Sequence, residues 1–141
     1  MGAARAERRL YFEDVQVDVP FETPGMTVTE AHVALFASLT TSRPDSPAAV
    51  PDLLPLCLSS GLGWRVPQPP LVVLAFMGFE WRFFKPTRVG DTIRSVSKTV
   101  AKRSMKDGGV VIEERQILNQ HREVVQSGRL TLLVAKRPAA A

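Results

Sequence analysis

Two aspartates in a proline-rich stretch are the residues best suited to acid–base chemistry. Asp52 lies at the predicted start of an apolar helix, where its carboxylate would face a ligand held at the helix end and could act as a general base or nucleophile. The position also suits an ordinary helix N-terminal aspartate that binds free backbone amides, and this interpretation is favoured. Asp45, with Ser42 and Ser46, could form another acid–base group, although this composition is also typical of a turn.

The histidines and the cysteine suggest little further chemistry. Cys57 is the single cysteine, which excludes an internal disulfide and a zinc site built of several cysteines. It lies in the most apolar segment and is predicted to be a small buried hydrophobe. His32 on a predicted helix and His121 in a predicted hairpin turn are expected at the surface. The sequence has no glycine-rich phosphate loop and no metal-ligand cluster, so no cofactor is expected.

The charge distribution argues against nucleic acid as a partner. The chain of 141 residues has 18 Lys and Arg against 14 Asp and Glu, a net charge of +4. The excess lies at the two ends, and the rest has 13 basic and 13 acidic side chains. Phosphate binding needs a concentrated basic patch. Because the N-terminus lacks an apolar leader and no apolar run could span a membrane, we expect no membrane partner and a cytoplasmic location.

Two helices are predicted to position these side chains. The first covers about residues 27–39 and is capped by Thr27 with Glu30 or by Thr29 alone. Its apolar face is predicted to consist of Ala31, Ala34, Leu35, Ser38 and Leu39. The second helix begins near residues 50–52 and is apolar on nearly every side as far as Leu62, so other structure must surround it.

The second half of the chain has the period of two that is typical of strands. Strands are predicted at about 71–84, 92–103, 110–119 and 123–135. Hairpin turns between them favour an antiparallel meander. A curved antiparallel sheet around one buried helix is an α+β hotdog fold with a single core. The predicted domain covers residues 10–137, between a flexible arm at 1–9 and a flexible tail at 138–141.

A series of motifs then carries a family resemblance. They are, in order, Tyr11-Phe-Glu-Asp-Val, Phe21-Glu-Thr-Pro-Gly-Met-Thr-Val-Thr-Glu30, Phe36-Ala-Ser-Leu-Thr40, Leu58-Ser-Ser-Gly-Leu62, Arg82-Phe, Lys85-Pro86, Val89-Gly-Asp-Thr-Ile93, Asn119-Gln and Glu123-Val-Val-Gln126-Ser-Gly128. The series resembles the MaoC-like hotdog family, the (R)-specific enoyl-thioester hydratases and dehydratases. It runs from about Tyr11 to Arg137.

The resemblance implies a homodimer or heterodimer whose sheets join edge to edge. It also implies an acyl thioester of coenzyme A or of an acyl carrier protein as substrate. Arg65, Arg82 and Arg88 could meet the phosphates of that carrier. Leu53 and Trp81 are candidates for contact with the acyl chain. Of the aromatic side chains after residue 63, most are expected in the core and some along an acyl tunnel.

The sequence departs from the family where the catalytic loop belongs. The family has a Gly-Asp-x-Asn-Pro-x-His loop whose Asp and His act on the water, whereas aligned positions here are Ser42 and Pro47. Serine is no base near neutral pH and proline has no titratable group. The loop is also shortened, and Asp52 replaces the family glycine whose N–H polarises the thioester carbonyl.

Three functions remain open on these residues. In the first, a dehydratase-like enzyme has altered chemistry and uses Asp52 or Asp45. In the second, the chain is the non-catalytic half of a heterodimer. In the third, it is a hotdog thioesterase in which Asp52 supports attack of water on the carbonyl.

Overall fold

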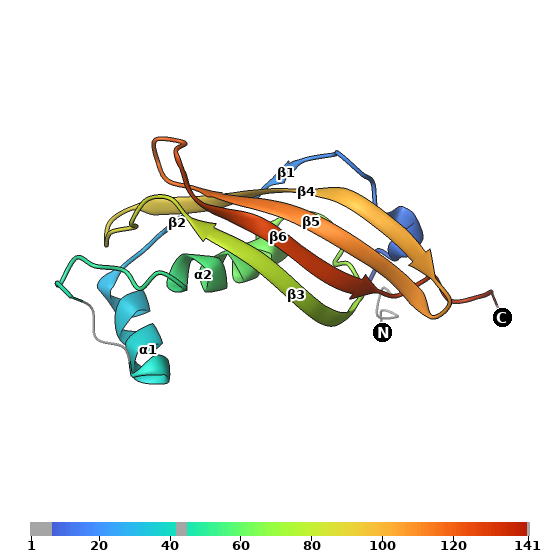
Figure 1. Ribbon diagram of the computed structural model, residues 1–141, viewed down its shortest axis with the longest axis horizontal. Helices are drawn as coiled ribbons and strands as arrows, with labels where there is room; N and C mark the ends of the chain where they lie inside the picture. Colours follow the sequence, from blue (N-terminus) through green and yellow to red (C-terminus); the bar gives the residue numbers. More distant parts are fainter. Residues whose placement is uncertain (1–6, 42–44, 141) are drawn as a thin grey trace, which may run out of the picture.

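The four long strands predicted from the sequence form one curved antiparallel sheet in the computed structural model, which describes residues 7–41 and 45–140. They are β3 (Val73–Phe83), β4 (Thr92–Met105), β5 (Gly108–Leu118) and β6 (Val124–Val134). The short strands β1 (Phe21–Glu22) and β2 (Met26–Thr27) pair with β4, and the main strand order is β1-β4-β5-β6-β3 (Figure 1). The predicted α+β hotdog class is confirmed, with β3 at one edge.

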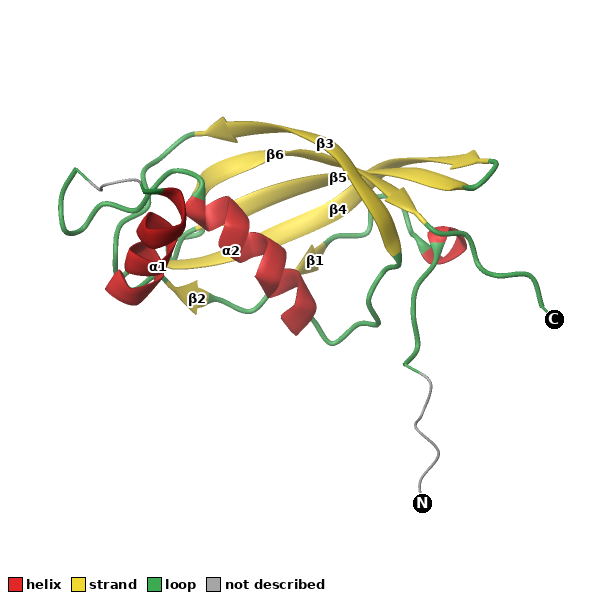
Figure 2. Cartoon of the chain, turned by 90° about the horizontal axis from the view of Figure 1, so that it is seen from below, coloured by secondary structure: helices red, strands yellow, loops and turns green. Residues whose placement is uncertain are grey.

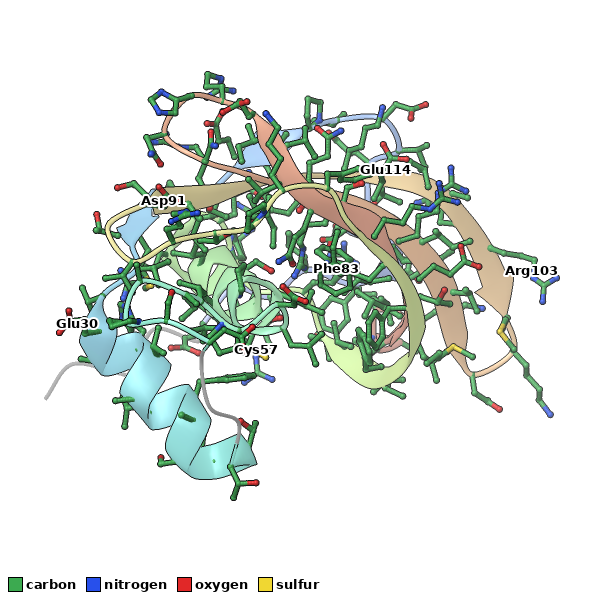
Figure 3. All side chains as sticks on the ribbon, turned by 60° about the vertical axis from the view of Figure 1, so that its left-hand side comes forward. Glu30, Cys57, Phe83, Asp91, Arg103 and Glu114 are labelled. Carbon is green, nitrogen blue, oxygen red and sulfur yellow. The ribbon has the colours of Figure 1, made fainter. Side chains whose placement is uncertain are left out.

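Helix α2 (Leu54–Leu62) runs across the inner face of this sheet (Figure 2). It buries Leu54, Pro55, Ser59 and Leu62, and the 3-10 helix η2 (Gly63–Arg65) follows it. The helix begins later than predicted, because a turn occupies residues 52–53. Its outer side is open in the single chain, so the prediction that Cys57 is buried is wrong: Cys57 is exposed (Figure 3).

Helix α1 (Glu30–Thr40) lies at one end of the molecule and points away from the sheet (Figure 1). Thr29 is its N-cap, and His32 is only partly exposed because its Nδ1 accepts the Thr29 N–H at 3.0 Å. The predicted apolar face is wrong, since Leu35 and Leu39 are 66% and 84% exposed. No helix among the described residues has the length and apolar character to cross a membrane.

The core has two parts instead of the single one predicted. One cluster lies around the start of α2 and includes Val28, Val33, Leu54, Ile93 and Ile117. The other contains Phe12, Val111 and Val134 at the opposite end of the sheet, where the 3-10 helix η1 (Phe12–Asp14) packs on the strands. The inner face of the sheet is therefore not apolar along its whole length.

An ion pair between β1 and the turn from β5 to β6 predicts a dependence of stability on pH. Arg122 donates to Glu22 at 2.8 Å, and this hydrogen bond, with the nearby charges of Arg122 and Arg94, lowers the pKa of the Glu22 carboxyl. A carboxyl with a lowered pKa in the folded state stabilises it above the ordinary carboxyl pKa and loses this effect as the pH falls through the lowered value. Glu22→Gln is therefore expected to lower the urea midpoint slightly at pH 7 and less at acidic pH, and Glu7→Gln is the control.

Candidate functional site

The start of α2 is an open helix end with an unpaired carboxylate beside it. The Leu54 N–H donates to the carbonyl of Pro51 at 3.0 Å, and no side chain caps the helix. Asp52 is exposed, and its carboxylate accepts no hydrogen bond from any described residue. The favoured sequence interpretation, in which this carboxylate binds the free amides of the helix, is therefore wrong. Because the Leu54 N–H is already bonded and Pro55 has no N–H, the backbone donors left for another acceptor at this end are those of Leu53 and Leu56.

Gln126 of β6 holds Asp52 and Trp81 together. Its side chain is 2% exposed, and its Nε2 donates to the backbone carbonyl of Asp52 at 2.8 Å. The Trp81 Nε1–H donates to Oε1 of the same amide at 2.9 Å. In the sequence, Gln126 stands out only as part of the motif Glu123-Val-Val-Gln126-Ser-Gly128. Its signal was a polar amide at an inner-facing strand position, where burial requires hydrogen-bond partners.

Replacing Gln126 with leucine is expected to lower the free energy of unfolding by about 1–3 kcal/mol, because the Trp81 N–H and the Asp52 carbonyl, whose hydrogen bonds are partly buried, lose their partner. Urea unfolding measures the loss. Gln116→Leu on β5 is the control, since Gln116 is exposed and surface changes of this kind cost about 0.5 kcal/mol or less. Equal stabilities of the two variants would contradict this role.

The other predicted site residues lie in several places. Leu53 is 51% exposed beside Asp52, so Asp52, Leu53 and Trp81 lie together. Arg65 lies in η2, past the other end of α2, and is not part of this group. Arg82 is exposed on β3, next to Trp81 in sequence and on the opposite face of the strand. Ser42 lies outside the described residues.

Asp45 and Arg88 lie on two further segments. Asp45 is exposed in a bend, and no hydrogen bond among the described residues joins it to Asp52. Arg88 is exposed, and its backbone forms a bridge with Ala49, three residues before Asp52. Of the three candidate arginines, Arg88 is thus tied most directly to the start of α2.

The edge strand β3 carries an exposed apolar surface. The prediction that most aromatic side chains after residue 63 are in the core is wrong, since Trp64, Phe76, Phe79, Phe83 and Phe84 are between 49% and 75% exposed. Of the described aromatic side chains after residue 63, Trp81 alone packs against a core cluster. Within the part of the chain described, β3 pairs only with β6, so one row of its backbone groups is unpaired. Such an edge is a template for another strand.

No imidazole accompanies Asp52. His32 caps α1, and His121 is exposed in the turn between β5 and β6, as predicted. No group of three or more His, Cys, Asp or Glu among residues 7–41 and 45–140 is placed to hold a metal ion. The arrangement offers one carboxylate beside a polarised helix end. That combination suits proton transfer next to an activated carbonyl group.

The chain is similar to several known proteins in sequence or in fold. The β-methylmalyl-CoA dehydratase of Chloroflexus aurantiacus is 33% identical over 147 residues, which cover 90% of this chain but 40% of that protein. The structure of a monoamine oxidase regulatory protein from Archaeoglobus fulgius has a TM-score of 0.84 and 27% identity, covering 94% of this chain and 99% of its own. No family model matches the chain.

A MaoC-like dehydratase from Rhodospirillum rubrum has the same fold, with a TM-score of 0.76 and 24% identity over 92% of this chain and 99% of its own. The arrangement of sheet and helix is thus that of known hotdog structures, and the sequence is similar to that of a dehydratase. Sequence and fold together show that the chain has the hotdog fold and is similar to MaoC-like dehydratases.

Proposed function

We propose that this chain binds acyl thioesters of coenzyme A or a carrier protein and acts on them as a dehydratase-like enzyme with altered catalytic residues. The observation that carries this proposal is the unpaired carboxylate of Asp52 beside the uncapped start of α2. The thioester carbonyl would accept hydrogen bonds at the helix end, where the dipole favours negative charge. Residues 10–137 would form the whole domain, acting in the cytoplasm.

A single carboxylate is enough for both proton transfers in the dehydration of a 3-hydroxyacyl thioester. Asp52 would remove a proton from C2, which the polarised carbonyl acidifies. The C3–O bond then breaks as the C2–C3 double bond forms, and the departing hydroxide takes the proton from Asp52 to leave as water. The products are an enoyl thioester and water, and hydration is the same sequence in reverse. Gln126 would position Asp52 through its backbone carbonyl, and Arg88 would meet the phosphates of the carrier.

The functional unit would be a dimer through β3. Its unpaired backbone edge and its exposed Phe76, Phe79 and Phe83 would be covered by a second hotdog chain. This chain spans 40% of the length of the relative from Chloroflexus aurantiacus.

A second candidate function is that of a non-catalytic subunit. Neither histidine lies at the start of α2, so the acid that would assist departure of the hydroxyl could come from a partner hotdog chain. In that case this chain would bind the acyl group while the partner supplies the Asp and His of the family loop, for which Ser42 and Pro47 are substituted here.

Native mass measurement followed by hydration of crotonyl-CoA tests both candidates. We expect a homodimer. Near neutral pH it should hydrate crotonyl-CoA, so that the absorbance of the enoyl thioester falls and no thiol is released, with a turnover number in the range usual for enzymes. Activity only after co-expression with a second hotdog chain would favour the non-catalytic subunit. Release of free thiol without hydration would replace both candidates with the thioesterase hypothesis.

A further inference from the structure

A cavity of about 520 Å³ lies between the second half of α2 and the inner face of the sheet. Its wall on the sheet side carries the polar side chains Ser95 and Ser97 from β4 and Glu113 and Arg115 from β5, next to the apolar Val111 and Leu132. Ser59 of α2 lines the opposite wall. The volume is in the range of small-molecule sites, and the cavity separates the two parts of the core.

The polar wall interrupts what would otherwise be an apolar row. The inner-facing side chains of β5 are Val111, Glu113, Arg115 and Ile117. The two at the ends of this row, Val111 and Ile117, are 1% and 0% exposed. Ser97 is paired directly across from Arg115 in the register of β4 and β5. A charged pair in the middle of an inner face costs desolvation energy, so its position calls for a function other than packing.

Arg115 connects the sheet to α2 through this cavity. Its Nε and Nη2 donate to the same carboxylate oxygen of Glu113, at 3.0 and 2.6 Å. Its Nη1 donates to the hydroxyl of Ser59 at 3.2 Å. The side chains of Arg115 and Glu113 are only 14% and 13% exposed. The guanidinium is therefore fixed in position, with its charge matched by Glu113.

Several polar groups on this wall still lack partners. Arginine has five N–H groups, and the three hydrogen bonds above leave two of them without a partner among the described residues. The second carboxylate oxygen of Glu113 accepts no bond there either. The residues Ser95 and Ser97 are each 2% exposed and line the cavity. Among the described residues, the only buried side-chain polar atom without a partner is Oγ1 of Thr87, so the groups on this wall open onto the cavity and can meet a polar group of a ligand there.

We propose that this cavity binds the far end of the acyl chain and selects chains that carry a hydroxyl or keto oxygen there. Arg115 would donate to that oxygen, while Glu113 or a serine hydroxyl would accept the proton of a hydroxyl. A carboxylate is disfavoured because Glu113 already balances the charge of Arg115 and would repel a second anion. This inference rests on the proposed acyl-thioester function and names its substrate class.

The length of α2 determines which carbon of the acyl chain must carry the oxygen that Arg115 binds. Ser59 follows Asp52 by seven residues, which is about 10 Å at the rise of an α-helix. An extended covalent chain advances about 3.5 Å for every three bonds. A thioester held at the start of α2 would therefore bring the tenth carbon or so of its chain to Arg115.

Calorimetric titration of the purified chain with three coenzyme A thioesters tests the proposal: decanoyl, ω-hydroxydecanoyl and decanedioyl. We expect ω-hydroxydecanoyl-CoA to bind at least about tenfold more tightly than decanoyl-CoA, as for a hydrogen bond to a charged group. The double variant Glu113→Leu with Arg115→Met should lose this preference and keep its affinity for decanoyl-CoA. The matched control is Glu114→Leu with Arg129→Met, which removes an ion pair whose side chains are 35% and 59% exposed and should keep the preference.

Each other outcome has a definite meaning. Equal binding of the decanoyl and ω-hydroxydecanoyl thioesters would overturn this inference and leave the acyl-thioester function intact. Tightest binding of decanedioyl-CoA would overturn the selection of a neutral oxygen. Binding of none of the three would overturn the proposed function itself. If the double variant does not fold, Ser97→Ala decides, because it should reduce the preference severalfold without disturbing an ion pair.

Discussion

Asp52→Asn is expected to reduce the turnover of crotonyl-CoA by about 10²- to 10⁴-fold, the usual contribution of a positioned general base. The amide cannot take a proton from C2, and it has nearly the size of the carboxylate. Because the Asp52 side chain is exposed and accepts no hydrogen bond from the described residues, folding should not change. The rate constant kcat should fall while the affinity for the thioester remains, since binding uses the helix end and the acyl pocket.

Two matched variants make this result specific. Asp107→Asn changes an exposed aspartate in the turn between β4 and β5, far from α2 in the fold, and should leave turnover unchanged. Asp45→Asn shows which of the two candidate carboxylates is the general base. If this variant loses most of its turnover while Asp52→Asn keeps normal turnover, Asp45 is the base instead of Asp52. Full activity of both variants would remove the altered-dehydratase proposal and favour the non-catalytic subunit.

The strands were predictable because their side chains alternate over long stretches. In β4, the sequence from Thr92 to Ser97 buries every second residue, and the turn residues around Gly108 mark where β4 ends. Such local patterns depend on neighbouring residues alone. The bounds of the long strands were therefore predicted to within a few residues.

The helical faces were less predictable because contacts from distant residues decide them. In α1, the stripe of Ala31 and Leu35 and the stripe of Val33 and Phe36 are both consistent with helical spacing. Val33 belongs to the core cluster that also contains Val28 and Ile93, and these partners bury its side of the helix. In α2 every face is apolar, so the sequence does not indicate which face the sheet covers, and Cys57 lies on the uncovered one.

The site was only partly predictable for a related reason. Asp52 could be located from its place before an apolar helix. The hydrogen bonds of Gln126 to Asp52 and Trp81 join residues 74 and 45 positions apart in the chain, and no local pattern indicates such contacts. Glu113 and Arg115 alternate with Val111 and Ile117 and so share their face of the strand, but only the fold shows that Arg115 meets Ser59 of α2 there.

The close approach of β3 and β6 at Gly128 predicts the largest effect on stability. A Cβ at this position would overlap the backbone carbonyl oxygen of Glu80 and lie 2.5 Å from Cε3 of Trp81. The Glu80 carbonyl cannot move away without disrupting the pairing of Glu80 and Trp81 with Arg129 and Gly128. Gly128→Ala is therefore expected to lower the free energy of unfolding by about 3 kcal/mol or more, as overpacking against backbone does in severe cases.

Gly78→Ala is the matched control on the neighbouring strand, because a Cβ at Gly78 meets nothing within 4 Å. Alanine in place of a strand glycine reduces the entropy of the unfolded chain, so this variant should be as stable as the original or more stable by about 0.5–1 kcal/mol. Urea unfolding gives both values. Hydrogen exchange of the β3 amides should become faster in Gly128→Ala, and equal exchange and stability in the two variants would contradict the close approach. Because Trp81 holds Gln126, and Gln126 holds Asp52, a displaced β3 should also lower turnover, which Gly78→Ala should leave unchanged.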